Sequence, residues 1–187
     1  MSSEVDLESL LDEFYGGDLV EIAKDDQGSH LQLGTFDRVS DVPAPYDGLL
    51  NHHHHMTVTV EAFHKEKVNV SVHRHHINGR HYTREITLVT ELSKRFVQYG
   101  IVRIDMSALA DPVWKQIESG EIPLGRVLIE NEVLRDVEMQ QLWKIQAGPC
   151  LAEKLHSVIG ETFYGRTAMI HCDGNPAIEL LEIVSKV

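Results

Sequence analysis

The chain has 187 residues, of which 42% are hydrophobic and 25% charged, proportions typical of one globular domain with a substantial core. Its formal net charge of −12 argues against a nucleic-acid or anionic-membrane binder, so neither is expected as a partner. The two cysteines lack metal-type spacing, the acidic N-terminus lacks the order of a signal peptide, and no apolar run approaches the ~18 residues of a membrane span. These features predict a cytoplasmic protein with reduced thiols.

The N-terminal part divides into one helix and a poorly patterned segment. Apolar residues at helical spacing predict a helix over residues 5–14, which Gly16-Gly17 would end. Residues 25–48 favour either a loose arm or a peripheral strand and turn. We therefore expect residues 1–44 to form a helix and arm packed on a main domain of residues 45–187. The pattern does not predict an oligomeric state.

The main domain alternates strands and short helices. Thr57 is a candidate N-cap of a helix ending at His64, although the β-branched Val58-Thr59-Val60 also suits a strand. Asn78-Gly79 is typical of a hairpin turn, and Asp111-Pro112 begins a helix that Gly120 would end. A second helix is expected over 149–159. Strands are expected over 68–72, 82–88, 96–104, 133–145, 163–171 and 177–184. Together these predict an α+β fold: one antiparallel sheet of about six strands, helices on one face and an internal ligand cavity.

Arg84 is the most unusual residue of this pattern. Strand residues alternate between faces, so Arg84 shares a face with Tyr82, Ile86 and Leu88, the face that a fold would bury. A buried guanidinium needs an anion, and its planar fork suits a carboxylate. The alternative is an arginine at a sheet edge or paired with a structural glutamate.

Four segments together resemble the chorismate lyase family, including its broader uncharacterised branch. They are Leu49 to Phe63 (LLNHHHHMTVTVEAF), Tyr82 to Leu88 (YTREITL), Ile122 to Leu128 (IPLGRVL) and Gly165 to Val184 (GRTAMIHCDGNPAIELLEIV). Each motif is weak alone, but their order and spacing make the resemblance specific.

The resemblance implies a lyase that removes pyruvate from chorismate, or a close relative, to give 4-hydroxybenzoate. It implies no cofactor, because aromatisation of the ring drives the reaction. It further implies a small anionic aromatic or pre-aromatic ligand bound by Met56, Arg84, Leu124 and Glu182. Arg84 would hold the carboxylate and Glu182 would donate a proton, so both are the candidate catalytic residues.

Two assignments stay open at this point. The glutamate of the last strand matches Glu182 only after a one-residue shift, and Glu179 is the alternative because both faces of that strand look apolar. Arg166, in the family's GR pair, is either a second positive group or a surface residue at a strand edge.

The histidines form the second unusual feature. His52 to His55 run together, and there are twelve histidines in all. Clustered imidazoles bind zinc, copper or nickel, but a solvated loop is the simpler interpretation, so no metal ligand is assigned.

Three functions are therefore open: a cofactor-free lyase, a non-catalytic binder of small aromatic acids with the same fold, and a metal-binding protein built on the histidines. The binder hypothesis includes effector-binding domains of transcription regulators. The acidic segment before residue 45 does not resemble a DNA-binding winged helix, which disfavours a complete regulator.

Overall fold

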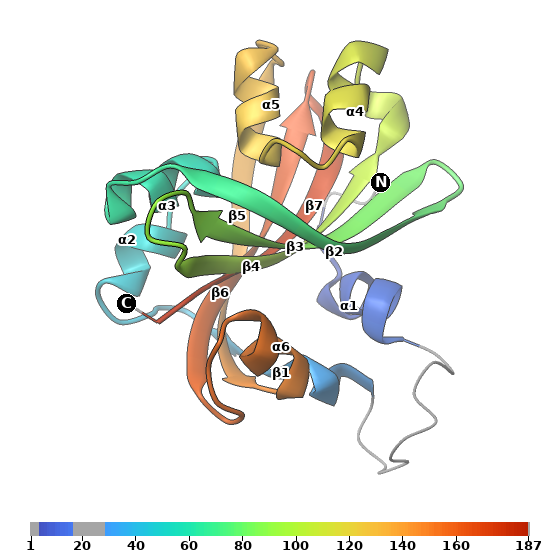
Figure 1. Cartoon of the computed structure of the whole chain (residues 1–187). Helices are drawn as coiled ribbons and strands as arrows, with labels where there is room; N and C mark the ends of the chain where they lie inside the picture. Colours follow the sequence, from blue (N-terminus) through green and yellow to red (C-terminus); the bar gives the residue numbers. More distant parts are fainter. Residues whose placement is uncertain (1–3, 17–28, 187) are drawn as a thin grey trace.

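The computed structural model describes residues 4–16 and 29–186, in which seven antiparallel strands form one sheet in the order β1-β5-β6-β7-β4-β3-β2 (Figure 1). The strands are β1 (Gly34–Val39), β2 (Val68–Asn78), β3 (His81–Thr90), β4 (Phe96–Asp105), β5 (Arg135–Ala147), β6 (Thr162–Cys172) and β7 (Asn175–Val184). The helices are α1 (Leu7–Tyr15), α2 (Tyr46–Leu50), α3 (Met56–His64), α4 (Asp111–Glu118), α5 (Leu124–Glu130) and α6 (Pro149–Lys154), with short 3₁₀ turns η1 (Ser29–Gln32) and η2 (Met106–Ala108).

This architecture confirms the predicted α+β fold with a single antiparallel sheet. The six expected strands are all present, and β1 adds a seventh at the edge by pairing with β5. β1 lies within residues 25–48, for which the sequence favoured either a loose arm or a peripheral strand and turn. The proposed end of the first helix includes Gly17, which lies outside the described residues.

Turn chemistry explains two hairpins of the sheet, β2–β3 at its edge and β6–β7 near its centre. Gly79 has a φ of 59° at the β2–β3 turn, and Asp173 and Gly174 have φ of 50° and 79° at the β6–β7 turn. Positive φ at such positions matches the right-handed twist of the flanking strands and favours glycine, asparagine and aspartate. Residues 56–64 are helical, but His55 takes the N-cap position assigned to Thr57, and no side chain caps this helix.

Helices cover both faces of the sheet. Helices α2 to α5 pack on what we call the cavity face, where α4 and α5 lie side by side (Figure 1). Helices α1 and α6 pack on the opposite face, which we call the α1 face, around Tyr99, Ile101 and Leu181. We expected the helices on one face only; this detail is wrong, because α1 and α6, which correspond to the helices expected over 5–14 and 149–159, cover the other face. Because the sheet is covered on both sides, β7 is buried on both faces from Ala177 to Val184.

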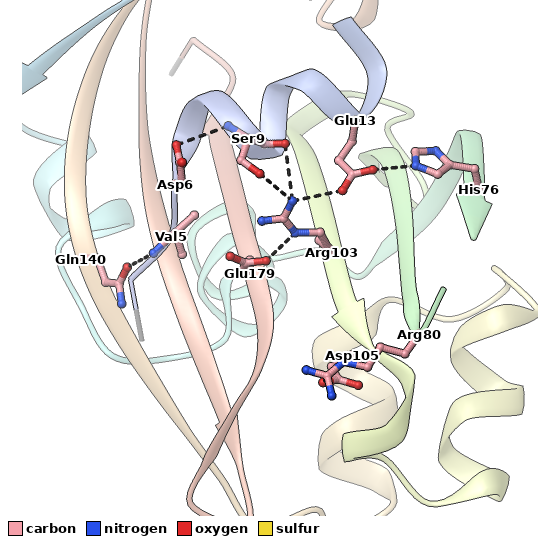
Figure 2. Close-up of polar contacts among 10 residues, drawn as sticks. All are labelled: Val5, Asp6, Ser9, Glu13, His76, Arg80, Arg103, Asp105, Gln140 and Glu179. Atoms are coloured by element: carbon pink, nitrogen blue, oxygen red, sulfur yellow. Dashed lines mark hydrogen bonds and ion pairs between the residues drawn. The ribbon is translucent and has the colours of Figure 1, made fainter. Parts of the chain in front are cut away.

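Polar side chains attach α1 to its face of the sheet (Figure 2). Arg103 of β4 donates from Nε to Glu179 Oε2 at 2.5 Å and from Nη1 to Glu13 Oε1 at 3.0 Å. Glu13 also contacts His76 Nε2 at 2.7 Å. Burial opposes ionisation of Glu13, but the hydrogen bonds from Arg103 and His76 outweigh it and hold the pKa of Glu13 below its usual range. Helix α1 is thus anchored by charged groups as well as by its apolar side.

Candidate ligand-binding cavity

A cavity of about 40 Å³ lies between the cavity face of the sheet and the first residues of α3 and α5. A volume of this size holds a few water molecules. Its lining residues come from both helices, from the loop before each, and from five strands. They are His55, Met56, Thr57, Arg84, Ile86, Leu88, Gln98, Val102, Pro123, Leu124, Gly125, Val137, Arg166, Ile170, Leu180 and Glu182. All four residues predicted to bind a ligand are among them.

Arg84 is buried, and none of the described residues is a charged partner for it. It lies on β3 in register with Val102 of β4 and His75 of β2, and Val102 is in turn in register with Leu180 of β7, so none of these register positions places a carboxylate beside it. Its side chain is 1% exposed, and its Nη1 donates to the carbonyl oxygen of Ile117 at 3.1 Å. Among the described residues no carboxylate forms an ion pair with Arg84, and its Nε has no hydrogen-bond partner. Burial lowers its pKa. A guanidinium in this condition is prepared to receive an anion.

Glu182 and Arg166 form a buried ion pair in the same cavity. Arg166 Nε donates to Glu182 Oε2 at 2.7 Å, and the Arg166 side chain is 0% exposed. Its Nη1 and Nη2 donate to the carbonyl oxygens of Leu50, His52 and His54. Arg166 is therefore a buried residue that holds the histidine loop, not a surface residue at a strand edge. Glu182, which we expected among apolar neighbours, faces a guanidinium instead.

The register of β7 separates the two candidate glutamates. Glu182 pairs with Gly100 of β4 and faces the cavity, whereas Glu179 pairs with Arg103 and faces α1. Glu179 is thus occupied by the network that anchors α1. Only Glu182 shares a cavity with Arg84.

Met56 and Leu124 occupy equivalent positions in the two helices that line the cavity. Met56 is the first residue of α3 and Leu124 the first residue of α5, and both are buried. The next residue, Gly125, permits the close contact of these helix ends. A Cβ there would lie 3.0 Å from His55 Cβ and 3.1 Å from Thr57 Oγ1. The glycine of the PLG motif therefore lets α5 approach α3 closely enough to cover the cavity.

Two histidines of the loop contact arginines at the cavity: His55 lines it, and His52 contacts Arg166, which lines it. His52 Nε2 lies 2.8 Å from the carbonyl oxygen of Leu49, which assigns the proton to Nε2 and leaves Nδ1 to accept from Arg166 at 3.2 Å. His55 Nε2 accepts from Arg135 Nε at 2.7 Å. Burial, reinforced by the adjacent arginines, lowers the pKa of each histidine to about 4. Both are neutral at pH 7, so they add no charge to the cavity.

The other histidines do not gather with these into a metal site. Within residues 4–16 and 29–186, no group of three or more histidine, cysteine, aspartate or glutamate side chains is arranged to hold a metal ion. In the same residues, no helix is long and apolar enough to cross a membrane.

The sequence analysis missed Gln98. This residue of β4 is 3% exposed and lines the cavity, and its Oε1 has no hydrogen-bond partner among the described residues. The signal was present: Gln98 alternates with Gly100 and Val102 on one face of its strand, as Arg84 does among apolar residues of β3.

No family model matches the chain, and no curated protein matches it. Solved structures do. The effector domain of PhnF from Mycobacterium smegmatis is 8% identical, with a TM-score of 0.51 over 71% of this chain and 88% of that domain. The longer PhnF chain matches at 8% identity and a TM-score of 0.50, over 70% of this chain and 63% of PhnF. A GntR-family transcriptional regulator from Enterococcus faecalis V583 is 9% identical, with a TM-score of 0.44 over 62% of this chain and 92% of that one.

These likenesses correct one prediction. We expected no nucleic acid among the partners because of the net negative charge, and this expectation is wrong: the chain has the fold of an effector domain, that of PhnF, which is one part of a longer chain. The net charge describes the surface of this domain and excludes nothing about DNA contacts made through other parts of an assembly. At 8% identity the likeness to PhnF shows the fold alone: this chain and the PhnF effector domain share their architecture. That fold agrees with the broader branch of the resemblance.

Proposed function

We propose that this chain is a binding domain for a small organic anion, whose carboxylate is held by Arg84. The supporting observation is that Arg84 is almost fully buried, lines a cavity and lacks a carboxylate partner among the described residues. A buried charge of this kind destabilises the empty protein, so its retention is explained by a ligand that supplies the missing charge.

The charges of the cavity favour a ligand with a single carboxylate. Arg166 is neutralised by Glu182 at 2.7 Å, so Arg84 is the one cation of the cavity lining without a counter-ion among the described residues. A second carboxylate on the ligand would meet Glu182 instead of a free cation. An aromatic or cyclic monocarboxylic acid satisfies both the charge and the apolar lining.

Binding requires the cavity to enlarge, because about 40 Å³ is below the size of ligand pockets. The helices that close it are α3 and α5, which are joined by an ion pair between Glu61 and Arg126. Glu61 also accepts from Lys67 at 2.8 Å and from the backbone N–H of Val68 at 3.1 Å. Separation of the two helix ends would admit a ring and change the outer surface of the domain. Such a change would suit a domain that reports ligand binding to a larger assembly.

A second candidate function is the pyruvate-releasing lyase. The convergence of Met56, Arg84, Leu124 and Glu182 on one cavity favours it. In that reaction the ether C–O bond breaks, the ring loses a proton, and the enolpyruvyl group takes up a proton as pyruvate. As a carboxylate paired with Arg166, Glu182 would first accept the ring proton and then return it, reversing the order that we expected for a proton donor.

The test uses benzoate and 4-hydroxybenzoate as probes in calorimetric titrations. Wild-type protein should bind at least one, Arg84→Ala should bind neither, and Arg84→Lys should bind weakly because an ammonium cannot form the bidentate contact. Arg80→Ala is the matched control, since Arg80 is exposed and paired with Asp105 outside the cavity. Incubation with chorismate, followed by detection of pyruvate, separates the lyase from the binder. Unchanged binding in Arg84→Ala would overturn the proposed site.

A further inference from the structure

A second polar group of the cavity lacks a partner. Five buried side-chain atoms of the described residues have no hydrogen-bond partner, and of these only Arg84 Nε and Gln98 Oε1 belong to residues that line the cavity. One is a cationic donor and the other a neutral acceptor. Gln98 is 3% exposed, so water outside the protein does not satisfy its amide.

The sheet register places the two groups at different levels of the cavity. Arg84 of β3 is in register with Val102 of β4, and Gln98 lies four residues before Val102. Their levels are therefore about 13 Å apart along the strands, at ~3.3 Å per residue. Between them lies Gly100, in register with Glu182. A Cβ on Gly100 would lie 3.1 Å from the carbonyl oxygen of Leu181 and in ordinary contact with Ile86 Cδ1, at 3.6 Å, and Gln98 Nε2, at 3.7 Å. The amide of Gln98 therefore extends along the sheet towards the level of Gly100.

We propose that Gln98 determines specificity by binding a hydroxyl group at the end of the ligand opposite its carboxylate. This inference rests on the proposed function, in which Arg84 holds the carboxylate. A hydroxyl both donates and accepts, so it satisfies the amide of Gln98 in either orientation of its oxygen and nitrogen. A second carboxylate is disfavoured there because Glu182 lies at the intervening level and Gln98 carries no charge. The ligand class is therefore a hydroxy-substituted cyclic or aromatic monocarboxylic acid.

The experiment compares benzoate with 3-hydroxybenzoate and 4-hydroxybenzoate in calorimetric titrations of wild-type protein and Gln98→Leu. Wild-type protein should prefer one hydroxy acid over benzoate by about tenfold or more, because benzoate leaves the buried amide unsatisfied. Gln98→Leu should remove this preference by weakening the hydroxy acid and leaving benzoate unchanged or tighter. Gln146→Leu is the control. Gln146 of β5 donates to Thr162 of β6, outside the cavity lining, so its replacement should leave the preference for the hydroxy acid unchanged.

The outcomes separate this inference from the proposed function. If wild-type protein and Gln98→Leu bind the acids with the same preference, the assignment of Gln98 is wrong while the Arg84 site stands. If wild-type protein binds none of the three acids, the proposed function fails, and the assignment of Gln98 fails with it. A melting temperature in Gln98→Leu equal to or above that of wild type verifies folding, since the substitution removes an unsatisfied buried group.

Discussion

At the residue scale, the cavity contains two buried arginines in opposite electrostatic conditions. Arg166 donates to a carboxylate and to three backbone carbonyl groups, whereas Arg84 donates to one carbonyl oxygen, that of Ile117. The Ile117 oxygen also accepts from the backbone N–H of Gly120 at 3.2 Å. Arg84 therefore contributes little to the stability of the empty protein, and Arg166 contributes much. Residues kept at a cost to stability are characteristic of binding sites.

This difference predicts opposite effects of the same substitution. Arg84→Met should raise the free energy of unfolding by about 1–2 kcal/mol, because it replaces an uncompensated buried charge by an apolar side chain. Arg166→Met should lower it by about 3–5 kcal/mol, because it leaves Glu182 buried and unpaired. Chemical denaturation of both variants without ligand measures the two values. A loss of stability in Arg84→Met comparable to that in Arg166→Met would show that Arg84 is structural.

At the scale of elements, α1 is attached to the sheet by groups on the residues next to the cavity lining. Val102 of β4 and Leu180 of β7 line the cavity. Their neighbours Arg103 and Glu179 face α1 (Figure 2). On each of these two strands, therefore, a residue of the cavity lining is adjacent to a residue that faces the N-terminal helix. This alternation is the ordinary period of a strand, used here with both faces covered.

Substitutions of two arginines shown in Figure 2 test which interactions hold α1 on the sheet. Arg103→Met should lower the free energy of unfolding by about 3 kcal/mol and increase amide exchange in α1, because it leaves Glu179 buried without its cation. Arg80→Met should cost less than about 1 kcal/mol, because Arg80 is 57% exposed where it pairs with Asp105. Hydrogen-exchange mass spectrometry with denaturation distinguishes them. Equal exchange of α1 in both variants would mean that its apolar side alone holds the helix.

At the scale of the whole molecule, the stability of the fold should depend on pH through groups whose ionisation the fold alters. His52 and His55 each have a pKa lowered to about 4, chiefly by burial. An unfolded histidine titrates near 6.5, so between about pH 6.5 and pH 4 the unfolded chain binds protons that the folded chain does not. Their contribution to stability is therefore complete above pH 6.5 and is lost as the pH falls towards 4.

The carboxylates extend this trend to lower pH. Burial opposes ionisation of Glu85, but hydrogen bonds from Arg74, Tyr15 and Tyr99 outweigh it and hold its pKa below the usual value, as Arg103 does for Glu13. Their stabilisation is present above the unfolded pKa and is lost as the pH falls through the folded one.

Melting temperatures measured from pH 7.5 to 4.5 should therefore decrease steadily as the pH falls. The decrease between pH 6.5 and 4.5 should be smaller in the double variant His52→Gln, His55→Gln, in which glutamine keeps a hydrogen-bonding group but does not titrate. A double variant with the same slope as wild type would show that the loop histidines are already protonated or exposed in the fold.

Much of the fold and part of the cavity followed from local pattern. Alternation of apolar residues located six of the strands, and Asn78-Gly79 and Asp173-Gly174 located two hairpins. The buried position of Arg84 followed from the same alternation. These inferences succeeded because strand period and turn chemistry depend on the backbone and on neighbouring residues, which the sequence contains.

Other features depended on which segments meet, and only the tertiary structure decided them. Both faces of β7 are apolar because helices cover both, so pattern alone could not choose between Glu179 and Glu182; pairing with Gly100 and Arg103 of β4 makes the choice. Segments distant in sequence likewise decide that Arg166 holds the histidine loop and that Gln98 Oε1 has no hydrogen-bond partner among the described residues. A sequence records which side chains a strand presents to each face, but the free energy of a buried polar group depends on the atoms brought against it from elsewhere in the chain.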